Sequence, residues 1–175
     1  EAYCSPHYHP MSQGIALEGM RLVNEYLPRA YADGTDIEAR AQMMSAAAMG
    51  AVAFQKGLGA IHSLSHPVGA VYGTHHGTTN AVVMPAVLAF NRPAIEERLE
   101  RAAAYLGIPN GYVGFCDHVL ALRARLGIPD RLGELGVGSD RLDDLTAMAL
   151  QDPSVGGNPV PMTAENTRAL FEAVI

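Results

Sequence analysis

Histidines are concentrated in one short part of the chain. Four of the seven lie within fifteen residues, at His62, His66, His75 and His76. Neutral imidazole is the commonest metal ligand in proteins, and it also exchanges protons near neutral pH. A lone buried histidine usually only hydrogen-bonds to the backbone. Four histidines in an apolar, glycine-rich stretch instead favour a metal-binding or catalytic site. We therefore interpret residues 57–80 as the chemical centre of the chain.

His62 and His66 are four residues apart, so on a helix they share one face about one turn from each other. This spacing suits two imidazoles that converge on one centre. The residues between them are Ser63, Leu64 and Ser65, with no glutamate. The general base of the His-Glu-x-x-His metalloproteases is therefore missing, which excludes that class of hydrolase.

The elements that must position these histidines are predicted to be helices, because apolar residues recur at three- and four-residue spacings. The sequence predicts helices over residues 11–30, 39–54, 81–90, 94–106, 115–126, 140–150 and from Thr163 to the C-terminus. Two-residue alternation is absent, so no strand is predicted. The fold class is therefore all-α, a bundle of about seven to nine helices.

Several residues indicate where these helices begin and end. Pro28 is expected to end the first helix, and Thr35 to cap the second in a capping box with Glu38. Pro85 is expected to kink a helix, and Pro93 to open a separate one. Thr78, Thr79 and Asn80 are expected to cap the helix that follows them. The helix over 39–54 is nearly uncharged, which predicts that it is buried.

Composition limits the classes of function. The chain has 175 residues and 49% hydrophobic residues, which fits a single domain over 1–175 with a sizeable core. The net charge is −6, with no basic stripe, so no nucleic-acid partner is expected. No apolar run reaches the ~20 residues that a bilayer needs, so no membrane partner is expected. Two cysteines fit a reducing compartment, which predicts a cytoplasmic location.

The motif around the histidines resembles the signature of the iron-containing (group III) alcohol dehydrogenase family. The residues that carry the resemblance are Gly59-Ala-Ile-His-Ser-Leu-Ser-His-Pro-Val-Gly-Ala70, followed by His76-Gly77-x-x-Asn80-Ala-Val-Val-Met-Pro85. Glu1-Ala2-Tyr3 resembles the family's His-x-x-Glu-Ala-Tyr segment, and Gly156-Gly-Asn-Pro159 resembles its C-terminal loop. The resemblance therefore covers essentially the whole chain.

The resemblance implies a fold and a ligand set. The family combines an N-terminal α/β domain that binds NAD(P) with a C-terminal helical, dehydroquinate synthase-like domain that holds a metal, and this chain is similar only to the second. An Asp and three His hold the family's metal, and His62 and His76 match two of the three His. The other two ligands precede the Glu-Ala-Tyr segment, so they would lie upstream of Glu1. The metal would be Fe²⁺, Zn²⁺ or another divalent ion, since these ligands suit several.

The remaining histidines and one cysteine have their own expectations. His66 matches a family position near substrate and nicotinamide, and it is the candidate catalytic residue, as a proton relay. His75 is an alternative metal ligand to His76. The match of His76-Gly77 to the family motif favours His76. His7 and His9 are expected in a loop or at the surface, and Cys4 is expected to serve packing.

The implied activity is hydride transfer between a primary alcohol or aldehyde and NAD(P), with the ion as Lewis acid. A maleylacetate, lactaldehyde or hydroxybutyrate enzyme on the same scaffold is an alternative, and so is a stand-alone metal-binding or dimerisation module without activity. A homo-oligomer, as a dimer, is expected. Two ligands make a poor site, so the chain alone is expected to bind metal weakly and to be inactive. The assignment requires His62 and His76 to point at a common spot near Glu1.

Overall fold

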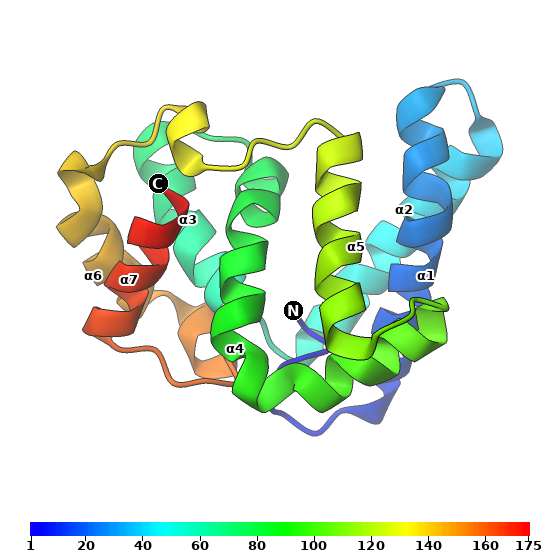
Figure 1. Cartoon of the computed structure of the whole chain (residues 1–175), viewed down its shortest axis with the longest axis horizontal. Coiled ribbons are helices and arrows are strands. Elements are labelled where there is room, and N and C mark those ends of the chain that lie inside the picture. Colours follow the sequence, from blue (N-terminus) through cyan, green and yellow to red (C-terminus); the bar gives the residue numbers. More distant parts are fainter.

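The computed structural model describes residues 1–175 and is built of helices, as the sequence predicts (Figure 1). The seven α-helices are α1 (Pro10–Ala32), α2 (Ile37–Ala53), α3 (Ala60–Tyr72), α4 (His76–Leu106), α5 (Gly111–Arg125), α6 (Leu142–Gln151) and α7 (Ala164–Val174). Short 3₁₀ helices cover Phe54–Lys56, Leu132–Leu135, Ser139–Arg141 and Pro153–Gly157. None of the helices has both the length and the apolar character needed to cross a lipid bilayer.

Two hydrophobic cores lie on either side of α4. The first joins α3, α6, α7 and the first half of α4, with Leu64, Val83 and Phe171 fully buried. The second joins the N-terminal segment, α5 and the second half of α4, around Ile95 and Leu99. In Figure 1, α6 and α7 lie at one end of the molecule, and α1 and α2 at the other. Helix α4 is thus the central element that connects the two cores.

Helix α4 corrects the prediction of two separate helices over 81–90 and 94–106. It is continuous over 31 residues, and both Pro85 and Pro93 lie inside it. Each proline removes one backbone donor, and Figure 1 shows that the helix bends about halfway along its length. Burial of residues from Val82 to Ala103 in the two cores compensates for the lost hydrogen bonds. Pro28 likewise lies inside α1, which ends at Ala32, so the prediction that Pro28 ends the first helix is wrong.

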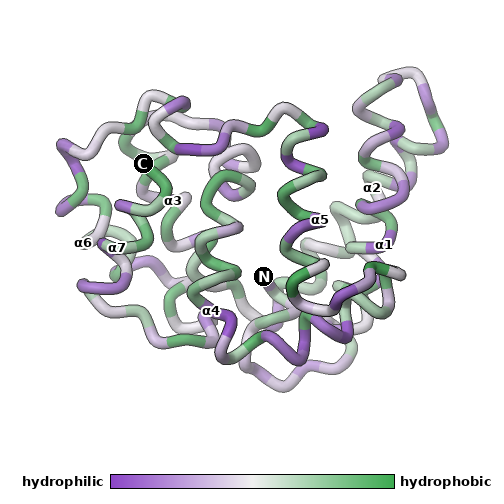
Figure 2. Tube along the Cα trace, in the orientation of Figure 1, coloured by the Kyte–Doolittle hydropathy of each residue, from purple (hydrophilic) through white to green (hydrophobic).

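The start of α2 also differs from its prediction. Asp36, not Thr35, is the N-cap, and its carboxylate accepts a hydrogen bond from the Ala39 amide at 2.9 Å. Thr35 instead donates its hydroxyl and amide hydrogens to the Asp33 carboxylate. Glu38 pairs with Arg29 across the polar tip between α1 and α2, which is purple in Figure 2.

Helix α2 is not the buried helix that its composition predicts. Only Ala39, Ala46 and Ala53 are buried, and these residues form one stripe at seven-residue spacing. Helix α2 packs mainly against α1, and Met44 is 75% exposed. An apolar composition therefore did not reveal how many sides of this helix are covered.

The N-terminal segment is fixed by two cations. Glu1 to Ser5 form a helical turn, with the Ser5 amide donating to the Glu1 carbonyl at 3.0 Å. The buried Lys56 ammonium donates to the carbonyls of Ala2 and Tyr3, and Arg98 donates to that of Cys4 at 2.7 Å. Cations at carbonyls that lack helical partners stabilise such a turn. Glu1 is thereby held against α3.

Candidate active site

Three of the four clustered histidines meet at one place between α3 and α4. The ring centroids of His62 and His76 are 5.2 Å apart, and that of His66 lies 5.5 Å from His62 and 5.4 Å from His76. His62 and His66 stand one turn apart on α3, and His76 is the first residue of α4. The αL conformation of Gly73, with φ of 67°, ends α3 and allows the chain to turn back within three residues.

Asn80 shows that two of these imidazoles point at a common spot. Its Nδ2 lies 3.1 Å from His76 Nε2 and 3.5 Å from His62 Nε2. An amide nitrogen donates, so both Nε2 atoms present a lone pair toward the same point. The buried Oδ1 of Asn80 has no hydrogen-bond partner. Two convergent, unprotonated nitrogens are what a divalent ion requires of imidazole ligands, so the residues present fit a metal.

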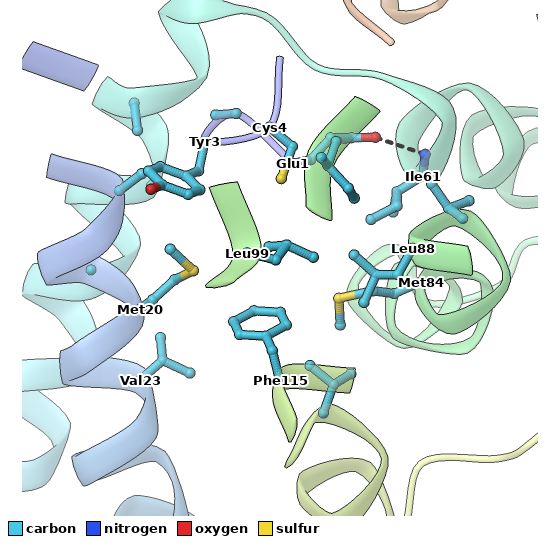
Figure 3. Close-up of a pocket in the computed structure, with 18 of the residues that line it drawn as sticks. Glu1, Tyr3, Cys4, Met20, Val23, Ile61, Met84, Leu88, Leu99 and Phe115 are labelled. Carbon is cyan, nitrogen blue, oxygen red and sulfur yellow. Dashed lines mark hydrogen bonds between the residues drawn. The ribbon is translucent and has the colours of Figure 1, made fainter. Parts of the chain in front are cut away.

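Glu1 orients His62 through Nδ1, the ring nitrogen that does not face Asn80. Its carboxylate accepts hydrogen bonds from the Ile61 amide at 2.7 Å, drawn in Figure 3, and from His62 Nδ1. Burial raises the pKa of Glu1, but the hydrogen bonds from His62 and from the Ile61 amide lower it, so the pKa is below its usual value. An ionised carboxylate can only accept, so in the neutral ring of His62 the proton is on Nδ1 and Nε2 is free.

Asp152 holds His66 in a similar way. Its Oδ2 lies 2.7 Å from His66 Nδ1, and its Oδ1 accepts a hydrogen bond from the Ser154 amide at 2.8 Å. Burial raises the pKa of Asp152. The hydrogen bonds from Ser154 and His66 lower it by more, so the pKa is below its usual value. The carboxylate is therefore ionised at neutral pH.

His76 has no carboxylate partner. Partial burial is the largest cause that lowers its pKa below the usual value, and the neighbouring His62, His66 and His75 lower it further. At neutral pH the ring is therefore uncharged, which is the form that binds metals.

The other predicted residues lie outside this cluster. His75 is the N-cap of α4, and its Nδ1 accepts a hydrogen bond from the Thr78 amide at 3.3 Å. The prediction that Thr78, Thr79 and Asn80 cap this helix is therefore wrong, since they lie inside it. His9 caps α1, and His7 is exposed. Cys4 is buried in the second core, at 7% exposure.

Asn158 fixes the C-terminal loop to the start of α3. Its side chain accepts from the Ala60 amide at 3.0 Å and from Asn91 at 2.8 Å, and it donates to Asn91 and to the Val160 carbonyl. A β-carbon at Gly59 would lie 2.8 Å from Asn158 Oδ1, so only glycine permits this approach. The network sets the position of the loop that begins at Asp152 relative to the histidines.

A cavity of about 470 Å³ adjoins the cluster (Figure 3). Glu1 and His62 lie on its wall, and α1, α2, α4 and α5 all contribute lining residues, including Met20, Leu99 and Phe115. Of its 29 lining residues, 20 are hydrophobic, so the cavity suits apolar atoms.

Sequence reasoning missed Glu1, Asn80 and Asp152 as members of the site. Glu1 was noted only as part of a motif, and Asp152 only as part of a loop. Their partners lie 61 and 86 residues away in sequence, so no local spacing reveals these contacts. No group of three or more His, Cys, Asp or Glu side chains in this chain is arranged to hold a metal ion.

Comparisons with known proteins identify the family to which the chain is similar. A sequence model described as the Fe-containing alcohol dehydrogenase family, C-terminal, matches residues 1–175. The chain is 41% identical to 4-hydroxybutyrate dehydrogenase of Cupriavidus necator over 98% of its length, and 39% identical to NAD-dependent methanol dehydrogenase of Bacillus methanolicus over 98%. A crystal structure of 1,3-propanediol oxidoreductase superposes over the whole chain with a TM-score of 0.95 at 29% identity.

These relatives are longer proteins. The chain covers 47% of each of the two curated relatives and 48% of the chain in the crystal structure. It thus spans about half the length of the relatives it matches.

Proposed function

The chain belongs to the iron-containing alcohol dehydrogenase family, and we propose that it is the metal-binding half of an NAD(P)-dependent enzyme that interconverts primary alcohols and aldehydes. The observation that carries the proposal is the convergence of His62 and His76 on Asn80 Nδ2. The nucleotide would bind an N-terminal α/β domain outside this chain. A cytoplasmic dimer is part of the same proposal.

His62 and His76 would hold the divalent ion through Nε2, and Glu1 fixes the tautomer that leaves His62 Nε2 free. The bound ion would supply Lewis acidity at the alcohol oxygen, which facilitates loss of the hydroxyl proton and of hydride from carbon. His66 is 43% exposed at its side chain, so it can pass a proton from the site to solvent.

The two further ligands of the family would be supplied from the stretch before Glu1. The family spacing is Asp-x-x-x-His-x-x-Glu, and in a helix residues at these intervals share one face. Glu1 lies in a helical turn with its carboxylate directed at His62. This arrangement supports a metal site completed next to Glu1, which also lines the apolar cavity.

The relatives support a primary alcohol as the substrate class. The names of the two curated relatives and of the solved structure refer to 4-hydroxybutyrate, methanol and 1,3-propanediol, which share a primary hydroxyl group. The highest identity given above, to the 4-hydroxybutyrate enzyme, favours an ω-hydroxy acid as the second candidate within this class.

The test is metal analysis of the full-length protein, combined with NAD(P)⁺ reduction by primary alcohols before and after chelation. We expect activity that is lost with a chelator and restored by Fe²⁺ or Zn²⁺. We expect His62→Ala and His76→Ala to lose both metal and activity, whereas His75→Ala retains both. The proposal fails if activity survives complete metal removal, or if residues 1–175 alone bind metal tightly and reduce NAD(P)⁺ with alcohols.

A further inference from the structure

Asp152 contacts the imidazole cluster from a loop that lies far away in sequence. We propose that Asp152 is a positioning residue, which holds His66 with its proton on Nδ1 and keeps Nε2 free to accept a proton from the substrate. The inference rests on the proposed role of His66 as a proton relay and adds the residue that prepares it.

Both oxygens of the Asp152 carboxylate are engaged. Oδ1 accepts from the Ser154 amide at 2.8 Å, and Oδ2 lies 2.7 Å from His66 Nδ1. The carboxylate therefore cannot rotate without losing a hydrogen bond, and only 11% of its side chain is exposed. Because an ionised carboxylate only accepts, His66 Nδ1 must donate, and in the neutral ring the second nitrogen, Nε2, is therefore the unprotonated one.

The position of Asp152 is set by rigid neighbours. It begins the 3₁₀ helix Pro153–Gly157, and that helix is followed directly by Asn158, which is hydrogen-bonded to α3 and α4. His66 lies on α3 itself, with its ring stacked on that of His76 at an interplanar angle of 15°. Both partners of the pair are thus fixed to the same helix, and the hydrogen bond between them defines the ring orientation.

The fixed tautomer has a chemical consequence. With NAD(P)⁺ as the hydride acceptor, oxidation of the alcohol would break its O–H bond, and the released proton would form a new N–H bond at His66 Nε2. His66 is then an imidazolium stabilised by the Asp152 carboxylate, and it returns to neutral by losing the Nε2 proton to water. With the other tautomer, Nε2 would already carry a hydrogen and could not accept.

Asp152→Asn tests this inference in the Zn²⁺-loaded full-length enzyme. The amide oxygen retains the Ser154 hydrogen bond, so its NH₂ group faces His66 Nδ1 and favours the tautomer with hydrogen on Nε2. With ¹⁵N-labelled histidine, assigned by comparison with His66→Gln, we expect the protonated nitrogen to change from Nδ1 to Nε2. We expect kcat to fall on the order of 10- to 100-fold, with unchanged KM and metal content.

Two further variants separate positioning from general structure. Asp152→Glu keeps the carboxylate and is expected to restore the Nδ1 tautomer and most of kcat. Asp144→Asn, at an exposed residue of α6 that pairs with Arg141, is expected to change neither. A loss of kcat in Asp144→Asn equal to that of Asp152→Asn contradicts the inference.

The unmodified enzyme provides a test that does not depend on how any variant folds. If His66 in the native protein carries its proton on Nε2, the inference is overturned. If Asp152→Asn switches the tautomer and leaves kcat unchanged, the positioning role stands and the relay role in the proposed function is wrong.

Discussion

Gly157 lies so close to Leu58 that a β-carbon on residue 157 would stand 2.0 Å from the Leu58 carbonyl oxygen. Carbon and oxygen atoms that are not bonded to each other do not approach so closely. The backbone at Gly157 is therefore in direct contact with the backbone just before α3. This contact holds the loop that carries Asp152 and Asn158 against the helix that carries His62 and His66.

Gly157→Ala is expected to lower the free energy of unfolding by about 1–3 kcal/mol, the usual cost of overpacking. The colliding atom belongs to the backbone and cannot rotate away, so the loop must shift. Urea unfolding measures the loss. Gly156→Ala is the matched control, because a β-carbon at Gly156 meets nothing within 4 Å, and its effect should stay within ~0.5 kcal/mol. Equal stability of the two variants would contradict the steric argument.

Asn91 and Asn158 are expected to act as one unit in stability. Asn158→Ala leaves the Asn91 side chain and the Ala60 amide without partners, and each unsatisfied buried group costs about 1–3 kcal/mol. In a double-mutant cycle, Asn91→Ala and Asn158→Ala should deviate from additivity by about 0.5–3 kcal/mol. The control cycle pairs Asn91 with Asn166, which belongs to the capping box of α7 with Thr163 and shares no hydrogen bond with Asn91. Additive effects in the Asn91–Asn158 cycle would show that the two amides are independent.

Glu1→Gln is expected to weaken metal binding by the full-length protein about 10- to 100-fold, the range for losing a partner that orients an imidazole ligand. The amide oxygen can keep the Ile61 hydrogen bond, which turns the NH₂ group toward His62 and favours hydrogen on Nε2. Competition with a chelator for Zn²⁺ measures the affinity. Glu96→Gln is the control, because Glu96 is an exposed partner of Arg92 on α4. An unchanged affinity in Glu1→Gln would exclude the orienting role.

His76 is expected to titrate below 6.5 in the metal-free protein, because partial burial and the three neighbouring imidazoles lower its pKa. Between that lowered pKa and 6.5 the unfolded chain binds more protons than the folded chain. The free energy of unfolding contributed by His76 is therefore fully present above pH 6.5 and decreases as the pH falls through this window. NMR titration of the ring measures the midpoint. His66→Gln removes one neighbouring charge and should raise the midpoint, and an unchanged midpoint would contradict this cause.

Local patterns in the sequence predicted one pair of site residues and most of the helices, but the predicted ranges left out α3 and divided α4 in two. Apolar periodicity is a property of each helix, and the four-residue spacing of His62 and His66 already places them on one face. The resemblance to the family added His76, which local spacing alone does not connect to α3. These three rings do meet in the structure.

Features that depend on tertiary packing could not be predicted in this way. Pro93 alone favours the start of a helix, but core packing on both sides of it keeps α4 continuous. The composition of α2 indicates apolar contacts without revealing that mainly α1 covers it. Asp152 and Glu1 reach their histidines across 86 and 61 residues, and only the folded chain brings them together.

The length of α4 gives the imidazole cluster a stability that its place at a helix end does not suggest. Terminal turns of isolated helices fray readily, and His76 stands in such a turn. The same helix, however, contributes Val83 to one core and Leu99 to the other. Unwinding of α4 is therefore resisted by both cores, so amide exchange at Val83 and Leu99 should be slow and should approach the rate set by global unfolding.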